Sequence, residues 1–217
     1  MEKLLNNNEV RLEGVVDSAP EYSHEIYGEG FCKLCLKVPR LSDNFDSVIL
    51  TISERMISDF DLYPGRFVQV EGQFRSYNNY SDEGNKLVLT VFVKKIFDMT
   101  EEFESPNSIY LNGYICKPPV YRTTPFGREI CDVLIAVNRQ YGKSDYIPCI
   151  TWGRNAKFTG NLAVGTNIKL WGRIQSRDYK KKISEEEYTE KTAFEVSVTK
   201  LEVVKNEEIE EFVQKNY

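Results

Sequence analysis

One segment of the sequence, IKLWGRIQSRDY at residues 168–179, alternates cationic and aromatic side chains with apolar or small ones. Successive side chains of a strand point to opposite faces, so the segment predicts one core face and one solvent face. The core face would hold Ile168, Leu170, Gly172, Ile174 and Ser176. The solvent face would hold Lys169, Trp171, Arg173, Gln175, Arg177 and Tyr179. Cations contact phosphates and flat rings stack on any base at about 1–3 kcal/mol each, so this face is typical of single-stranded nucleic-acid binding.

The preceding segment, DYIPCITW at residues 145–152, predicts a second strand with an apolar outer face. If Ile147, Cys149 and Thr151 face inward, then Tyr146, Pro148, Ile150 and Trp152 face outward. An outer face this apolar needs a cover, which could be nucleic acid, another domain or a second subunit. We favour nucleic acid for Tyr146 and Trp152, and an interface between domains or subunits for Trp171.

Charge is distributed unevenly along the chain, which carries a net charge of −5. Residues 1–105 have a net charge of −8, residues 106–182 a net charge of +9, and residues 183–217 a net charge of −6. The basic stretch coincides with the aromatic segments, which supports an anionic ligand there.

Residues suited to enzymatic chemistry are sparse. The single histidine, His24, has no second histidine and no Cys/His/Asp cluster beside it, so hydrolytic triads, metal sites and bound cofactors are not expected. The five cysteines include Cys32 and Cys35 in a C-x-x-C, but three residues along a strand separate opposite faces. We expect buried, reduced thiols and no enzymatic activity.

The chain repeats itself with a period of about 100 residues. Four segment pairs align in the same order: VRLEGVV (10–16) with IYLNGYI (109–115), FCKLCLKVPR (31–40) with ICDVLIAVNR (130–139), PGRFVQVEGQFRS (64–76) with VGTNIKLWGRIQS (164–176), and LTVFVKKI (89–96) with FEVSVTKL (194–201). Two copies of one unit are therefore predicted.

Each unit has the pattern of short strands with one helix-length interruption, at residues 53–63 and 153–163. Hairpin tips are expected at 28–30, 81–86, 124–127 and 180–191. Five strands and one short helix are the plan of an OB-fold Greek-key barrel, so we predict an all-β chain of two tandem OB barrels. The expected domains are 1–100 and 106–204, joined by the linker 98–108, with a short acidic tail at 205–217.

The second unit contains, in order, the motifs NSIYLNG (107–113), PVYRTTPFGRE (119–129), IAVNR (135–139), DYIPCITWGRNA (145–156), GTNIKLWGRIQSRDY (165–179) and FEVSV (194–198). Through these motifs, residues 107–201 closely resemble the bacterial single-stranded DNA-binding (SSB) protein family. The resemblance implies four aromatic residues that stack on bases: Tyr141, Tyr146, Trp152 and Tyr179. It also implies phosphate contacts from Arg122, Lys143, Arg154, Lys169, Arg173, Arg177 and the lysines at 180–182.

The first unit resembles a diverged copy of the second. Ser47 and Ser53 replace the rings of Tyr146 and Trp152, and Glu71 lies on the outer face of its fourth strand. We expect this unit to bind weakly or to have a structural role. Its weaker DNA-binding candidates are Arg40, Arg55, Arg75, Tyr77 and Tyr80.

The family resemblance also bears on partners and assembly. Family members commonly end in a long linker and an acidic tip that recruits replication and repair proteins, whereas 206–217 follow the second unit closely. Ile209, Phe212 and Val213 are spaced for one face of a short helix, which could dock on the protein itself. Because the usual member has one barrel per chain and is a tetramer, we predict a homodimer here.

The predicted function is sequence-nonspecific binding and protection of single-stranded DNA in bacterial replication, recombination or repair. Two alternatives remain: an adaptor that binds proteins of a replication or mobile-element complex, and an RNA chaperone, because stacking barely distinguishes the two sugars. A nuclease is not supported by any carboxylate or histidine cluster. No apolar run suggests a signal peptide or a membrane span, so we expect a cytoplasmic, nucleoid-associated protein beginning near Met1.

Overall fold

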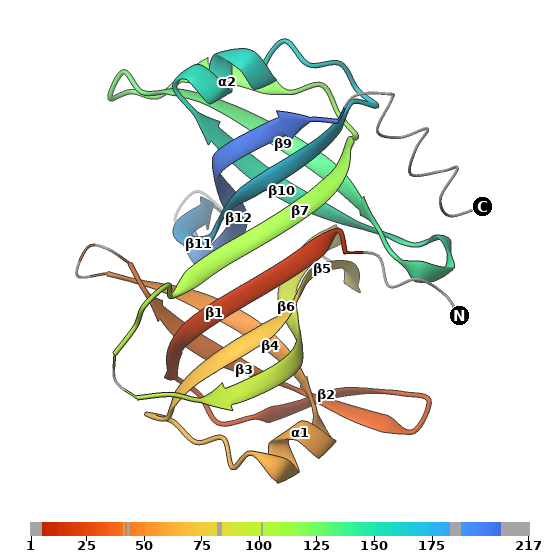
Figure 1. Cartoon of the computed structure of the whole chain (residues 1–217), viewed down its shortest axis with the longest axis vertical. Coiled ribbons are helices and arrows are strands. Elements are labelled where there is room, and N and C mark those ends of the chain that lie inside the picture. The colour runs from red at the N-terminus through yellow and green to blue at the C-terminus, as the bar shows by residue number, and fades with distance from the viewer. Residues whose placement is uncertain are drawn as a thin grey trace. The chain divides into compact units, whose positions relative to one another are not determined.

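The computed structural model describes residues 6–40, 42, 44–81, 84–100, 102–182 and 188–204, without the side chains of 79–86 and 178–191. Its elements in chain order are β1 (Asn8–Val16), β2 (Glu21–Ile26), β3 (Glu29–Pro39), β4 (Phe45–Ser53), α1 (Glu54–Asp59), β5 (Phe67–Ser81), β6 (Gly84–Asp98), β7 (Asn107–Ile115), β8 (Val120–Thr123), β9 (Glu129–Asn138), the 3-10 turn η1 (Gln140–Gly142), β10 (Ser144–Trp152), α2 (Arg154–Thr159), β11 (Asn167–Lys182) and β12 (Tyr188–Val203). The prediction of an all-β chain with two short helices is confirmed (Figure 1).

The first barrel is closed by β1, β3, β4, β6 and β5, taken in that order. β4 runs parallel to β6, the other ladders are antiparallel, and α1 lies between β4 and β5 in sequence. This is the OB plan predicted from the sequence. β2 adds a short outer strand to β3, and the hairpin tip between them contains Tyr27 and Gly28, both at positive φ.

The second barrel repeats this plan with β7, β9, β10, β12 and β11. β8 adds the outer strand to β9, and α2 lies between β10 and β11. The predicted core face of 168–176 is confirmed for Ile168, Leu170 and Ile174, which are fully buried.

Both repeats have a glycine where the first strand of the last hairpin, β5 or β11, lies very close to its partner strand. A Cβ added to Gly72 would meet the carbonyl of Phe92, and a Cβ added to Gly172 would meet the carbonyl of Ser197. A side chain at either position would displace backbone, which explains why the glycine occurs in both repeats.

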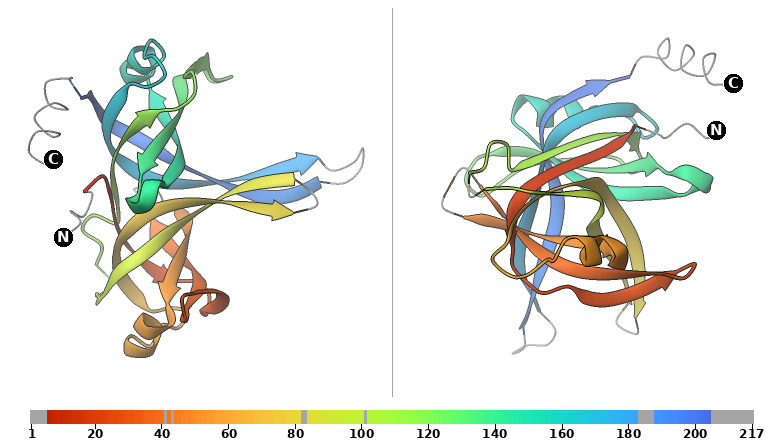
Figure 2. Two further views of the ribbon diagram at one scale, coloured as in Figure 1. Left: turned by 90° about the vertical axis from the view of Figure 1, so that its right-hand side faces the viewer. Right: turned by 60° about the horizontal axis from the view of Figure 1, so that its bottom comes forward.

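The last hairpin of each repeat has strands of 15 or 16 residues, longer than a small barrel needs. The paired region of β5 and β6 continues to Ser81 and Gly84, so that the hairpin reaches beyond its barrel as a two-stranded ribbon (Figure 2).

Internal contacts divide the chain into two compact units that do not coincide with the predicted domain boundaries. The 9–109 unit contains the first barrel and also residues 173–196. The 110–172 unit contains most of the second barrel together with residues 1–8 and 197–217. The predicted linker is anchored inside the 9–109 unit, because the backbone N–H groups of Glu104 and Ser105 donate to the buried carboxylate of Glu13. The boundaries 1–100, 106–204 and 205–217 remain a prediction.

Candidate nucleic-acid interface

β10 separates inner and outer side chains as predicted, with one exception. Ile147, Cys149 and Thr151 are buried, while Tyr146 and Trp152 are exposed on the opposite face. The exception is Ile150, which was expected to be exposed and is only 5% exposed. The outer face of β10 therefore does not present a continuous apolar strip in need of a cover; its accessible rings lie at Tyr146 and Trp152.

The indole of Trp152 is held by a neighbouring strand. Its Nε1 donates a hydrogen bond of 3.1 Å to the Oγ of Ser197 on β12, and the ring remains 36% exposed. The bond orients the ring while leaving part of it open to solvent, which a stacking residue requires.

Tyr141 lies in a tight loop just before β10. Its backbone has φ 61°, a left-handed conformation that is uncommon for a tyrosine, and its side chain is 82% exposed. The loop is closed by the N–H of Arg139, which donates to the carbonyl of Lys143 at 2.7 Å. Arg139 also pairs with the buried Asp145 at 3.5 Å. The loop thus holds the Tyr141 ring out in solvent.

The cations predicted to contact phosphates differ in their exposure and in their ion-pair partners. Lys143 before β10 and Arg154 at the start of α2 are exposed, and Lys169 on β11 is half-buried. Arg122 on β8 is exposed and pairs with Asp132 on β9, with its Nε 2.7 Å from a carboxylate oxygen. A phosphate would have to compete with Asp132 for this guanidinium.

Trp171 is covered by side chains of its own unit. Its ring lies 5.2 Å from that of Tyr110, and the ammonium of Lys200 lies 4.5 Å from its centroid. These contacts give the indole partners within the chain. Its predicted role at a domain or subunit interface, and its role as a stacking residue, both remain predictions.

Arg173 and Arg40 converge on one buried carboxylate within the 9–109 unit. Asp46 is fully buried, and its carboxylate receives Arg40 at 2.5 Å, Arg173 at 3.2 Å and the N–H of Ser176 at 2.8 Å. The hydrogen bond that Arg40 donates to Asp46 is the main reason why the pKa of Arg40 is raised. Both guanidiniums therefore already have an anionic partner, whereas Arg177, two residues beyond Gln175, is exposed.

The weaker candidates on the first barrel lie on α1 and β5, apart from Arg40, which follows the end of β3. Arg55 on α1 is exposed, and Tyr77 on β5 is exposed with the ammonium of Lys33 5.5 Å above its ring. Arg75 donates to Gln73 and stacks over the ring of Phe92 at 4.7 Å. Phe92 was not among the predicted residues, although its alignment with Ser197 in the repeat could have marked it.

Several predicted residues lie outside what the structure describes. The strands include Tyr80, Tyr179 and the lysines at 180–182, but their side chains are not among the described ones. The tail at 205–217, with Ile209, Phe212 and Val213, also lies outside the described residues.

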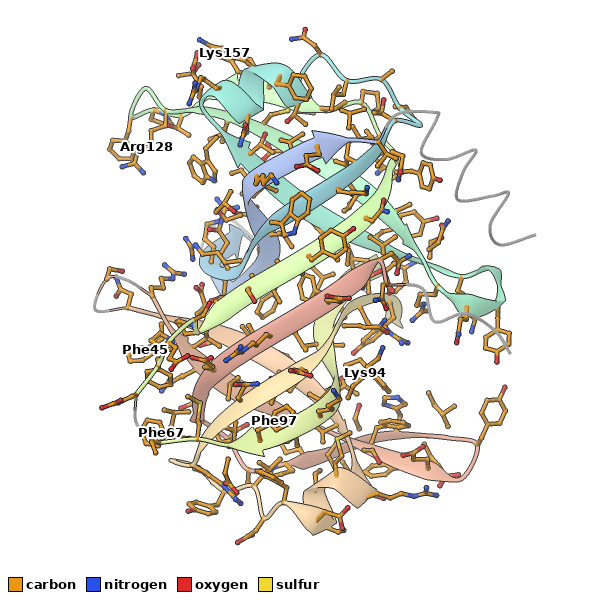
Figure 3. The ribbon with its side chains drawn as sticks, in the orientation of Figure 1. Phe45, Phe67, Lys94, Phe97, Arg128 and Lys157 are labelled. Carbon is orange, nitrogen blue, oxygen red and sulfur yellow. The ribbon has the colours of Figure 1, made fainter. Side chains whose placement is uncertain are left out.

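A second polar cluster of the 110–172 unit lies near α2 and was not predicted. The carboxylate of Glu129 accepts from Lys157 at 2.9 Å and from the hydroxyl of Tyr121 at 2.7 Å (Figure 3 labels Lys157). The hydrogen bond from Lys157 lowers the pKa of Glu129, and the same bond raises the pKa of Lys157. This pairing balances the charge of Lys157, whereas Lys143 just before β10 and Arg154 just after it are exposed.

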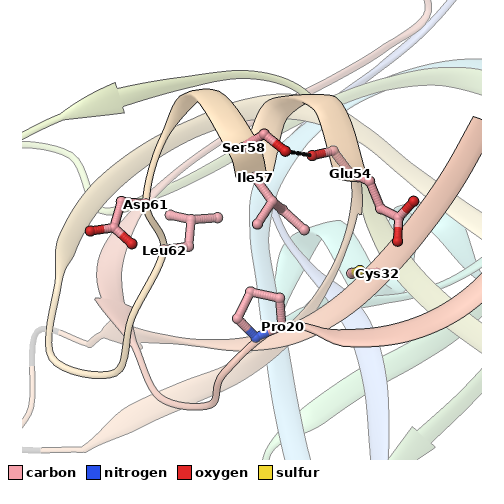
Figure 4. A pocket seen from close by; sticks show the side chains of 7 residues that line it. All are labelled: Pro20, Cys32, Glu54, Ile57, Ser58, Asp61 and Leu62. Carbon is pink, nitrogen blue, oxygen red and sulfur yellow. Dashed lines mark hydrogen bonds between the residues drawn. The ribbon is translucent and has the colours of Figure 1, made fainter.

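An open cavity of about 470 Å³ lies under α1 in the 9–109 unit (Figure 4). It is lined by Pro20, Cys32, Glu54, Ile57, Ser58, Asp61 and Leu62. The charged side chains of this lining are acidic, so it does not suit a phosphate backbone.

The described part of the chain contains no cluster of three or more His, Cys, Asp or Glu side chains suited to a metal ion. Within the same residues, no helix is both long and apolar enough to cross a membrane. The five cysteines are free thiols; Cys32 is buried, whereas Cys35 on the other face of β3 is partly accessible.

Residues 106–204, which form the second barrel, match the sequence pattern described as the single-strand binding protein family. The second barrel is thus similar to that family, and the match does not include the first barrel. The match agrees with the resemblance noted in the sequence and covers the strands that carry Tyr146, Trp152 and Lys169.

Individual relatives are similar in sequence to this chain over a shorter stretch than residues 106–204. Single-stranded DNA-binding protein 1 of Staphylococcus aureus (strain COL) is 36% identical over 80 residues, which cover 34% of this chain and 48% of that protein. Single-stranded DNA-binding protein A of Bacillus subtilis (strain 168) is 35% identical over 80 residues, which cover 34% of this chain and 46% of that protein. The chain thus spans about half the length of the curated relatives it matches.

A solved structure matches nearly the whole chain. Wild-type single-stranded DNA binding protein from Thermus aquaticus superposes with a TM-score of 0.73 and 19% sequence identity, covering 91% of this chain and 93% of that one. At this identity the likeness concerns the fold alone, and it shows that both barrels have the same fold as that protein.

Proposed function

We propose that the chain binds single-stranded DNA with little sequence preference, through the outer face of β10 and the loop before it. The observation that carries this proposal is the exposure of Tyr141, Tyr146 and Trp152, flanked by the exposed cations Lys143 and Arg154. Rings stack on any base and cations contact the phosphates between them, so no base-specific hydrogen bond is needed. The similarity of residues 106–204 to the single-strand binding protein family supports the same ligand.

Binding of this kind protects a single strand and prevents it from pairing again. We therefore place the protein in bacterial DNA replication, recombination or repair, in the cytoplasm, with the nucleic acid itself as its main partner. We also propose a homodimer, which would bring together four barrels, the number found in the usual tetrameric member. Sedimentation equilibrium would measure the mass, and a monomer at working concentrations would contradict the dimer.

The direct test is the affinity of the full chain for fluorescein-labelled oligo-dT, measured by anisotropy. Duplex DNA of the same length and oligo-rU serve as competitors. We expect tight binding of oligo-dT that duplex DNA does not displace. Displacement by oligo-rU at equal concentration would favour the RNA chaperone. The absence of any oligo-dT binding would contradict the proposal and favour the protein-binding adaptor.

A further inference from the structure

The two repeats place an aromatic ring at the same point of the barrel face, but on different strands. In the second barrel Trp152 on β10 bonds to Ser197 on β12. The internal alignment puts Ser53 at the position of Trp152 and Phe92 at the position of Ser197. β4 and β6 of the first barrel are direct neighbours, with Phe92 paired to Thr51. The ring missing from Ser53 is thus replaced by one from the adjoining strand.

Phe92 belongs to a row of rings that crosses the first barrel. His24 stacks on Phe31 with centroids 5.3 Å apart and planes 17° apart, and Phe31 lies 5.6 Å from Phe92. The guanidinium of Arg75 continues the row, 4.7 Å above Phe92. The members come from β2, β3, β6 and β5, all within the 9–109 unit. We call these four residues the Phe92 row.

The Phe92 row is accessible to a ligand where its members reach solvent. His24 is exposed, Phe92 and Arg75 are half-buried, and only Phe31 is buried. Exposed planar groups at this spacing suit bases, which stack on rings and on guanidinium planes alike.

Cations gather at the Arg75 end of the row. Lys94 lies on β6 two residues beyond Phe92 (Figure 3), and Lys33 lies over the ring of Tyr77. Partial desolvation lowers the pKa of Lys94, and the charge of Arg75 lowers it further, against an opposing effect of Glu9. Two cations that repel each other would both be stabilised by an anion placed between them.

At the other end of the row, beside Phe31, lies the acidic side chain of Glu29. Glu29 accepts a hydrogen bond of 2.6 Å from the hydroxyl of Ser53, which is paired with Phe31 across β3 and β4. A phosphate chain is therefore favoured over Arg75 and Lys94 and disfavoured near Glu29. An anionic ligand with flat groups fits this distribution better than an acidic peptide, which has no bases to stack.

We propose that the Phe92 row, with Lys33 and Lys94, is a second binding surface for single-stranded DNA. Phe92 and His24 stack on bases, and Arg75, Lys33 and Lys94 contact phosphates. The proposal rests on the proposed function and extends the strand length that one chain occupies. Glu29 makes this surface weaker than that of the second barrel.

The test places a fluorescent reporter in the row. A variant with Trp152→Phe, Trp171→Phe and Phe92→Trp keeps aromatic rings at all three sites and has one tryptophan, in the first barrel. Its fluorescence and the anisotropy of labelled oligo-dT are followed in the same titration. We expect quenching of the tryptophan when long oligo-dT binds, and a smaller response to oligomers that fill only the second barrel.

Affinity variants provide a second, independent measurement in the wild-type background. Phe92→Leu is expected to weaken binding of long oligo-dT about tenfold, while Phe92→Tyr keeps the ring and the affinity. Phe97→Leu is the matched control, because Phe97 is an exposed ring on the same strand outside the row (Figure 3). Thermal unfolding confirms that each variant is folded.

The outcomes separate the two proposals. Oligo-dT binding by anisotropy with no change in tryptophan emission, and full affinity of Phe92→Leu, would overturn the second surface and leave the proposed function intact. Absence of oligo-dT binding by the wild-type chain would overturn both. Binding of a protein to the row that oligo-dT cannot displace would also overturn the second surface.

Discussion

Trp152 and Ser197 are 45 residues apart in sequence and joined by a hydrogen bond of 3.1 Å between the indole Nε1 and the serine Oγ. The bond links β10 to β12 and fixes the one tryptophan that the second barrel presents on the outer face of β10. A ring fixed in this way loses little conformational entropy when a base stacks on it.

Replacing Trp152 tests the stacking contribution directly. Trp152→Ala should weaken oligo-dT binding by about 1–3 kcal/mol, because one ring–base contact is removed. Trp152→Phe keeps the ring and loses the hydrogen bond, so its affinity should stay closer to that of the wild type. Fluorescence anisotropy measures both. Equal affinity of Trp152→Ala and the wild type would show that the indole does not contact DNA.

Arg177 and Arg173 should respond differently to the loss of their positive charge. Arg177→Glu should lower the affinity and reduce the slope of log K against log salt by about 0.7, the value for one phosphate on a single strand. Arg173→Gln removes a guanidinium that already binds Asp46, so we expect lower thermal stability and a smaller loss of affinity. A larger change in salt slope for Arg173→Gln than for Arg177→Glu would contradict this assignment.

Asp46 should contribute to stability through three partners. Asp46→Asn removes the charged acceptor of Arg40, Arg173 and the Ser176 N–H, and should lower the free energy of unfolding by about 1–3 kcal/mol. Asp98→Asn is the control, since its pair with Arg66 lies at the surface and should contribute about 0–1 kcal/mol. Urea denaturation measures both; similar losses for the two variants would contradict the role of Asp46.

The thiols should be slow to react in the folded protein. Burial is the main cause that raises the pKa of Cys32, Cys35, Cys116 and Cys131. A raised pKa leaves a smaller thiolate fraction at a given pH, so DTNB at about pH 8 should label the native chain slowly and the denatured chain quickly. Rapid labelling of the native protein would contradict this burial.

The repeat made both barrels and the outer face of β10 predictable, because strand alternation and turn residues are local signals. Two features were not predictable in the same way. Arg173 donates a hydrogen bond to Asp46, which is 127 residues away in sequence, and no local pattern predicts such a pair. Strand alternation places Ile150 on the outer face of β10, yet its side chain is buried. Burial on that face depends on neighbouring strands, which the alternation of one strand does not describe.

The first barrel shows a third limit of position-by-position reasoning. Ser53 marks the loss of a ring at the Trp152 position, which predicts a weaker surface. Phe92 restores a ring from the adjoining strand, and this becomes visible only when β4 and β6 are seen side by side. Equivalent sites in a repeat need not use equivalent residues.

The central claim is tested most directly by the intrinsic tryptophan fluorescence of the wild-type chain, titrated with poly-dT at two salt concentrations. Trp152 and Trp171 are the two tryptophans of the chain, and both belong to the second barrel. We expect strong quenching, with a log–log salt slope of roughly −3.5 if about five phosphates are neutralised. Unchanged emission, together with no binding by anisotropy, would contradict single-strand binding by this face.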